Sequence, residues 1–404
     1  MPRFSYIAKS EEGLTKTGFL EAKDETELAE ALRQEGLFLI SSKTEDLSSK
    51  DKKFSLSLGS GVGSKDKLFF IRNLRVMTVA GVALPRAIAT LADQARNKNF
   101  KRALIKIQEK IIHGQSLSQS MQEYPEIFPE IFQNMVKVGE ESGTLEQVLN
   151  NLALQLEKQQ ELKSKIVSAL IYPLVVLSAM VGIGFLMLII VVPQLAETFA
   201  ELELTLPFTT RIVIWLGTTA KQYWYLLPIV IFGLVFIIRQ ILKLKSGKRL
   251  FDKLFLKLPA LSKLVRETSS ASFARTLSSL TASGVPLIKS LEIIAGTLDN
   301  VYFKDSLLAA VEQVKKGVKL SETLKPYNNL YLPIVVQMVE IGEETGETSQ
   351  VLEQLATFLE DEVTNATKNL ASIIEPLLML VVGGAVGFFA ISMIQPMYSM
   401  LEAL

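Results

Sequence analysis

The pattern of apolar and polar positions divides the chain into regions of different character. Near the start, Phe4, Tyr6 and Ala8 alternate with polar residues, which is typical of a half-buried strand. A second strand, a helix and a short apolar strand follow, so residues 1–43 predict a small ββαβ unit. Residues 44–64 are rich in Ser, Gly and Lys, and they predict a flexible linker.

The next hundred residues have helical spacing throughout and predict an all-α bundle. Residues 65–165 contain five breaks, which divide them into six helices joined by short turns. The sixth helix meets no helix breaker before an apolar run begins at residue 166. Residues 243–371 predict a second six-helix bundle on the same plan. The breaks in the first bundle fall at Gly81, Asn97-Lys98-Asn99, Gly114, Tyr124-Pro125 and Gly143.

The two bundles are related because the chain contains an internal repeat. The sequence VGEESG at residues 138–143 returns as IGEETG at residues 341–346, and Gly342 follows Gly139 by 203 positions. A solenoid unit spans only about 20 to 50 residues, so this spacing indicates a duplicated domain. The same offset joins Arg72 to Arg275, Gly114 to Gly317, Pro173 to Pro376 and Pro193 to Pro396.

Three long apolar runs predict transmembrane helices, at residues 166–192, 222–242 and 372–398. Each is near the roughly 20 residues that a membrane span needs, and none has a charge at its centre. The alternative is a buried helix of a soluble protein. A proline inside a helix removes one backbone hydrogen bond, so Pro173 and Pro376 predict kinks in the first and third spans.

Basic residues predict the orientation of these spans. Lysines precede the first span and follow the second, whereas residues 193–221 carry mainly glutamates. The positive-inside rule therefore places the N-terminus and both bundles in the cytoplasm, and residues 193–221 outside. Within that outer loop, residues 204–216 are apolar, and they predict either a helix on the membrane surface or an extended loop.

Composition adds mainly exclusions. Hydrophobic residues make up 49% and charged residues 21%, a mixture that suits polar domains joined to membrane spans. The formal net charge of +1 gives no general attraction to nucleic acid. The chain has no cysteine and one histidine, His113, which excludes disulfides, thiolate sites and multi-histidine metal sites. The glycine-rich segments lack phosphate-loop spacing, so the sequence predicts no catalytic residue, cofactor or metal.

The repeated acidic motif is the strongest candidate site. Its glutamates lie at a helix C-terminus, where the helix dipole disfavours a carboxylate by about 0.3 to 1 kcal/mol, so an offsetting partner is expected. Three interpretations stay open: ion pairs of Arg72 with Glu140 and of Arg275 with Glu343, a solvated acidic turn, or a divalent-cation site. The motif residues are Gly139, Glu140, Glu141 and Gly143, and Gly342, Glu343, Glu344 and Gly346.

Together, the Phe-x-Tyr-x-Ala strand, the two bundles, the repeated motif and the three apolar runs resemble the inner-membrane platform proteins of type II secretion and type IV pilus assembly. The resemblance implies a multi-pass, non-enzymatic protein of the bacterial inner membrane that forms a homo-oligomer. It implies contacts with a hexameric cytoplasmic ATPase, with pilin or pseudopilin subunits, with other inner-membrane assembly proteins and with lipid, but not with nucleic acid. The competing classes are a small transporter or channel, which predicts charge within a span, and a membrane-bound hydrolase, which predicts a nucleophile and base.

Overall fold

The computed structural model describes residues 3–10, 15–22, 25–34, 36–45, 61–201 and 207–403. The chain forms two compact units, Met1–Ser60 and Gly61–Leu404. Most of the predicted linker, residues 46–60, lies outside the described residues.

The first unit is a three-stranded antiparallel sheet with one helix. Its elements are β1 (Arg3–Ser10), β2 (Thr15–Glu21), α1 (Glu25–Gln34) and β3 (Leu37–Glu45), and the strand order is β2-β1-β3. Tyr6 lies opposite Gly18 on β2 and Ser42 on β3. Leu28 and Leu32 lie one helical turn apart on α1, and both are buried in a small core with Ala8, Ala22 and Leu37.

The second unit begins with the six helices predicted for the first bundle. They are α2 (Ser64–Val79), α3 (Leu84–Gln94), α4 (Lys98–Ile112), α5 (Leu117–Gln122), α6 (Glu130–Ser142) and α7 (Leu145–Leu186). Four of the five predicted breaks lie between two of them, and the fifth, Asn97-Lys98-Asn99, spans the start of α4. Gly81 and Gly114 adopt left-handed φ values of 72° and 88°, and the side chain of Asn97 caps α4 by accepting the N–H groups of Asn99 and Phe100.

The second bundle repeats this order. It contains α12 (Pro259–Ala282), α13 (Leu287–Thr297), α14 (Val301–Val314), α15 (Leu320–Leu324) with the short helix η2 (Lys325–Tyr327), α16 (Pro333–Thr345) and α17 (Thr348–Ala403). The aromatic core is repeated as well: Phe70, Phe100 and Phe128 pack together in the first bundle, and Phe273, Phe303 and Tyr331 do so in the second. Both bundles contribute to one continuous hydrophobic core, so they form a single packed body.

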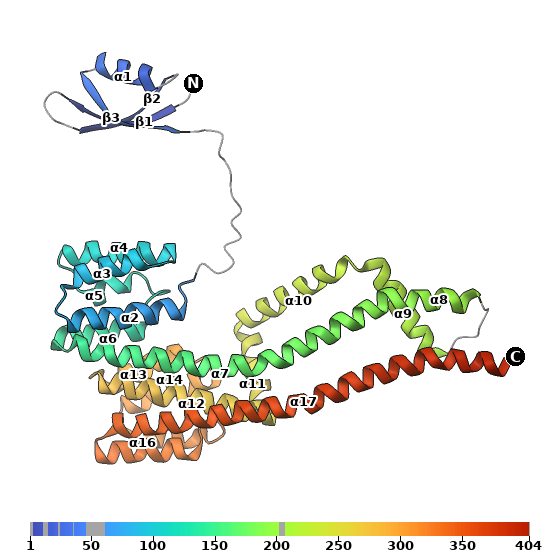
Figure 1. The fold of residues 1–404 in the computed structure, drawn as a ribbon. Coiled ribbons are helices and arrows are strands. Elements are labelled where there is room, and N and C mark those ends of the chain that lie inside the picture. Colours follow the sequence, from blue (N-terminus) through green and yellow to red (C-terminus); the bar gives the residue numbers. More distant parts are fainter. Residues whose placement is uncertain are drawn as a thin grey trace. The chain divides into compact units, whose positions relative to one another are not determined.

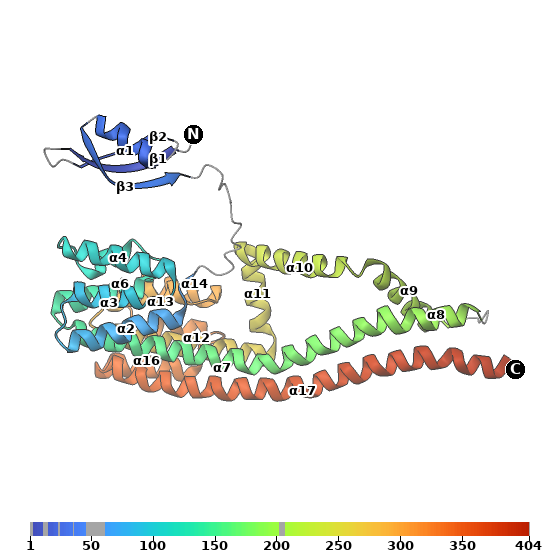
Figure 2. The same cartoon turned by 45° about the horizontal axis from the view of Figure 1, so that its top comes forward.

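The segment that connects the two bundles extends away from them and then returns. The helix α7 continues through one π-helical turn, η1 (Met187–Val191), into α8 (Val192–Glu201); α9 (Phe208–Tyr223), α10 (Leu226–Lys243) and α11 (Lys245–Lys257) follow. Figures 1 and 2 show α7 and α17 leaving the bundles in the same direction, with α10 running alongside them. The segment predicted as either a surface helix or an extended loop is helical from Phe208 on, and Val213 packs with Val192 and Met393.

Candidate functional site in the repeated motif

The glycines of the motif shape the joint between two helices. Gly143 ends α6 with a φ of 73°, in the left-handed region that favours glycine. A Cβ atom on Gly139 would lie 3.1 Å from the Cα atom of Leu145, so this glycine lets α6 cross the first turn of α7 closely. The second copy repeats both features, at Gly346 and Gly342.

The first glutamate of each motif caps another helix of its bundle. Oε1 of Glu140 accepts the N–H of Leu117 at 2.6 Å, and Oε2 accepts the N–H and the hydroxyl of Ser118 at 3.0 and 2.6 Å. These N–H groups begin α5 and have no acceptor within that helix, and the helix dipole favours a carboxylate beside them. In the second copy, Glu343 accepts two N–H groups of α15, at 2.5 and 3.0 Å. The group that compensates for the unfavourable position of this glutamate at a helix C-terminus is therefore the N-terminus of another helix.

The predicted ion pair of Arg72 with Glu140 is wrong, and so is that of Arg275 with Glu343. Both glutamates bond to backbone N–H groups, and both arginines pair with the long helix that follows the motif. Nη2 of Arg72 lies 2.5 Å from Oε2 of Glu157 on α7.

In the second bundle, Arg275 binds Glu360 on α17 through two hydrogen bonds. Its Nε and Nη2 atoms donate to the two carboxylate oxygens at 2.8 and 3.0 Å, and Nη2 also donates to Thr357 Oγ1 at 3.1 Å. Glu360 follows Glu157 by 203 positions, so the pair is duplicated. The two pairs differ in burial. The arginine and glutamate side chains are 51% and 47% exposed in the first copy, but 7% and 12% exposed in the second.

The second glutamate of each motif lies at the surface. Glu141 is 3.8 Å from Lys137, one helical turn away, and Glu344 is 3.8 Å from Lys319. Among the described residues, no group of three or more acidic or histidine side chains could hold a metal ion. The interpretation as a solvated acidic turn fits this second glutamate, and the geometry of the motif as a whole is that of a structural joint.

A polar seam, which the sequence pattern did not predict, joins the two bundles. Gln155 on α7 donates from Nε2 to Thr276 Oγ1 at 2.9 Å and accepts the hydroxyl of Ser279 at 3.1 Å, both on α12. Asn151 donates to Ser283 at 3.1 Å. The signal was the Ser- and Thr-rich face of residues 268–283, which is unusual for a helix that packs in a core.

Two helices of the described chain are long and apolar enough to cross a membrane, by length and composition. They are Leu145–Glu201, which joins α7 to α8, and Thr348–Gln395 within α17. Few residues of their most apolar windows are buried, unlike those of the core helix of a soluble protein. Pro173 and Pro376 lie inside these helices, and both helices bend along their length in Figure 1. Kinks at the prolines themselves stay a prediction.

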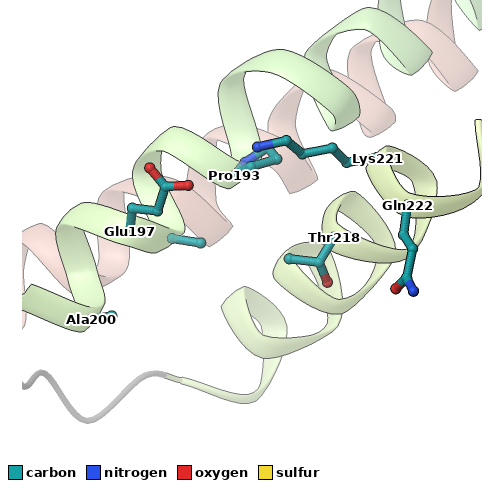
Figure 3. Close-up of a pocket in the computed structure, with 7 residues that line it drawn as sticks. Pro193, Glu197, Ala200, Thr218, Lys221 and Gln222 are labelled. Carbon is teal, nitrogen blue, oxygen red and sulfur yellow. The ribbon is translucent and has the colours of Figure 1, made fainter.

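A cleft of about 460 Å³ lies between α8 and α9, beyond the apolar part of α7. Figure 3 shows Glu197 on α8 and Lys221 on α9 among its lining residues, with Thr218 and Gln222 on the α9 side. Its described lining holds one carboxylate and one ammonium group but no histidine or cysteine.

One buried carboxylate lies on α12. Lys263 Nζ is 3.6 Å from Oε1 of Glu267, whereas Oε2 has no hydrogen-bond partner among the described groups. Burial raises the pKa of Glu267 above its ordinary value; Lys263 opposes the rise and Glu362 adds to it. The ionised form therefore destabilises the fold.

We expect Glu267→Gln to stabilise the chain near neutral pH. A carboxyl group whose pKa is raised in the folded state stabilises the fold at pH values below its ordinary pKa. This stabilisation is lost as the pH rises through the folded-state pKa. The advantage of the variant should consequently shrink as the pH falls toward about 4, near the ordinary glutamate pKa. Thermal unfolding of the detergent-solubilised chain across this pH range measures it. The exposed Glu347→Gln is the control, and equal pH profiles for both variants would contradict the prediction.

Comparison with known proteins decides the family. The model of type II secretion system protein F matches residues 70–193 and 273–396, and the model of its N-terminal domain matches residues 1–43. The chain belongs to the type II secretion system protein F family. The two matches lie 203 positions apart and cover the two copies found in the sequence.

Relatives of known role in this family are similar over their whole length. A type IV pilus assembly protein PilC of Thermus thermophilus is 33% identical over 404 residues, covering 100% of this chain and 99% of the relative. PilC of Myxococcus xanthus is 31% identical, covering 100% and 96%. A type II secretion system protein F of Aeromonas hydrophila is 30% identical, covering 93% and 97%. The family and the two exposed apolar helices together indicate a protein of the inner membrane.

Proposed function

We propose that this chain is a non-enzymatic platform of the bacterial inner membrane. In this role it couples a hexameric cytoplasmic ATPase to the assembly of pilin or pseudopilin subunits, in type IV pilus biogenesis or type II secretion. The pilus assembly and secretion systems for which the PilC and protein F relatives are named support this proposal. Its other partners are further inner-membrane assembly proteins and other copies of the chain, and the platform carries no cofactor.

The observation that carries the proposal is the continuity of bundle and apolar helix. The last helix of the first bundle, α7, runs without a break from Leu145 to Leu186, and α17 runs from Thr348 to Ala403. A displacement applied to either bundle would therefore pass along a stiff helix into the membrane. The shared core and the polar seam make the two bundles move together.

The experiment interrupts this continuity without removing a domain. Insertion of four glycines between Lys163 and Ser164 should uncouple the first bundle from its apolar helix, because glycine is a poor helix former. We expect filament assembly or secretion to be lost in cells that lack the native copy. The same insertion after Asn328, in an exposed turn of the second bundle, is the matched control and should preserve assembly.

Two biochemical measurements accompany it. Purified chain should hydrolyse no ATP, and crosslinkers placed on the bundles should reach the ATPase while those on the apolar helices reach pilin subunits. Intrinsic ATP turnover, or normal assembly by the Lys163 insertion when the chain is correctly inserted and folded, would contradict the coupling role.

We further propose three spans, residues 166–192, 222–242 and 372–398, with the N-terminus and both bundles in the cytoplasm. The second span contains most of α10, whose described apolar side chains are largely exposed, and Lys243 and Lys245 follow it.

Because the chain lacks cysteine, single cysteines report topology without background. We expect a membrane-impermeant maleimide to label Glu201→Cys in intact spheroplasts and to reach Gln115→Cys and Gln313→Cys only after lysis. Labelling at position 313 before lysis is incompatible with this topology.

A further inference from the structure

We propose that α11 is a binding site for anionic phospholipid that lies along the cytoplasmic surface of the membrane. The inference rests on the proposed membrane topology and adds a lipid class and a site to it. It concerns a helix outside both copies of the repeat, since the two family matches end at residue 193 and resume at residue 273.

Both ends of α11 lie where the apolar helices begin. Its first residue, Lys245, comes two positions after the last residue of α10. Its last residue, Lys257, is followed by α12, where Leu261 packs against the same hydrophobic cluster as Ile166 of α7 and Ile374 of α17. Ile166 and Ile374 stand at the start of the apolar parts of those helices. A helix that begins and ends at this level runs along the boundary, and Figure 2 shows α11 lying across the direction of α7 and α10.

One face of α11 is fixed to the second bundle. Asp252 Oδ2 accepts the N–H of Val301 at 2.8 Å at the start of α14, and Arg249 pairs with Asp305. The corner with α10 is also tight, because a Cβ atom on Gly247 would lie 2.1 Å from the carbonyl oxygen of Ile241. The orientation of α11 is therefore set by packing on both sides.

The opposite face is apolar and uncovered. At 100° per residue, Leu250, Leu254 and Leu258 fall together on the side away from Arg249 and Asp252. These leucines are 69%, 50% and 42% exposed. An apolar stripe of this kind on a protein surface marks an interaction site.

Positive charge borders this stripe. Lys253 and Lys257 flank it on one side and Lys248 on the other, and Lys245 begins the helix. Within the described part of the chain, none of these four lysines forms an ion pair with a carboxylate. In an interfacial helix, leucines enter the boundary of the acyl chains, and the lysines beside them contact the lipid phosphate groups. The leucines and lysines of α11 are arranged in this way. Continuity with the membrane helix α10 and complementarity to negative headgroups together favour an anionic lipid surface as the occupant.

The test measures the surroundings of Leu254 in the full chain. Leu254→Cys is labelled with an environment-sensitive fluorophore, and the chain is reconstituted in nanodiscs of phosphatidylcholine with or without phosphatidylglycerol. Two spin-labelled lipids serve as quenchers: one is labelled near the headgroup and reports the membrane surface at position 254, and one is labelled on the acyl chain and reports the bilayer interior at position 181. Val181→Cys, in the apolar part of α7, is the positive control, and Ile341→Cys, an exposed apolar position of α16, is the matched negative control.

We expect quenching at position 254 to be several-fold stronger than at 341 and to increase when phosphatidylglycerol is present. Replacing Lys253 and Lys257 by glutamine should abolish that increase and leave quenching at 181 unchanged. Quenching at 254 as weak as at 341, with 181 still quenched, overturns the inference while the membrane topology stands; loss of quenching at 181 overturns the topology itself. Equal quenching in both lipid mixtures refutes the anionic specificity, and a disulfide between two copies at position 254 identifies the stripe as a subunit contact instead.

Discussion

Arg275→Met is expected to destabilise the second bundle by about 3 to 5 kcal/mol. The substitution leaves the carboxylate of Glu360, only 12% exposed, without its two hydrogen bonds from Arg275. Removing one partner of a buried ion pair costs this much because the remaining charge stays buried and unpaired. Native-state hydrogen exchange measures the effect locally: amides of α12 to α16 should lose protection by a factor on the order of 10² to 10⁴.

The duplication supplies a matched control for this prediction. Arg72→Met removes the equivalent pair with Glu157, but those side chains are about half exposed, and exposed pairs contribute about 0 to 1 kcal/mol. The double variant Arg275→Met, Glu360→Leu should regain most of the lost stability, since apolar replacement of both partners is often neutral. Equal losses from Arg72→Met and Arg275→Met would show that burial does not decide the energy of this pair.

Glu140→Ala is expected to destabilise the first bundle by about 2 to 3 kcal/mol. It removes the acceptor of two N–H groups and one hydroxyl at the start of α5. Loss of a helix cap typically costs about 1 kcal/mol, and hydrogen bonds to a charged group contribute about 1.5 to 3 kcal/mol. Exchange at α5 should accelerate most, because its first N–H groups lose their acceptor.

The neighbouring glutamate provides the comparison. Glu141→Ala removes a surface carboxylate of the same motif, and its effect should stay within about 0.5 kcal/mol. Glu343→Ala and Glu344→Ala repeat the comparison in the second bundle. Unchanged exchange at α5 in Glu140→Ala would mean that water replaces the carboxylate at no cost.

Local signals were sufficient for the organisation of the bundles. Left-handed glycines such as Gly81 and Gly114 end helices whatever their tertiary surroundings, and Asn97 caps the next helix through its own side chain. Because the two copies are related by an offset of 203 positions, the same order of helices was predicted for the second copy. These features depend on residues close in sequence, so the pattern alone predicted the helix joints.

The partners of the motif could not be predicted in the same way. The predicted partner of Glu140 was a side chain of opposite charge, whereas its partner is the backbone at the start of α5, which residue types do not reveal. The repeat did hold a usable signal, because Leu117-Ser118 returns as Leu320-Ser321 and Glu157 as Glu360. The burial of these pairs could not be predicted either, because the same two residue types are exposed in one copy and buried in the other.

The direction of the two long helices has a consequence for the segment that joins the two bundles. The repeated unit is a bundle followed by one outgoing helix, which crosses the membrane once in the proposed topology. Two such units joined directly would leave the second bundle at the far end of the first helix, yet the bundles share one core. Residues 194–272 lie between the two family matches and contain α10, which runs back toward the bundles. This returning helix allows both bundles to lie at the same end of the long helices. In the proposed topology, removal of α9 to α11 would therefore place the second bundle on the opposite side of the membrane from the first.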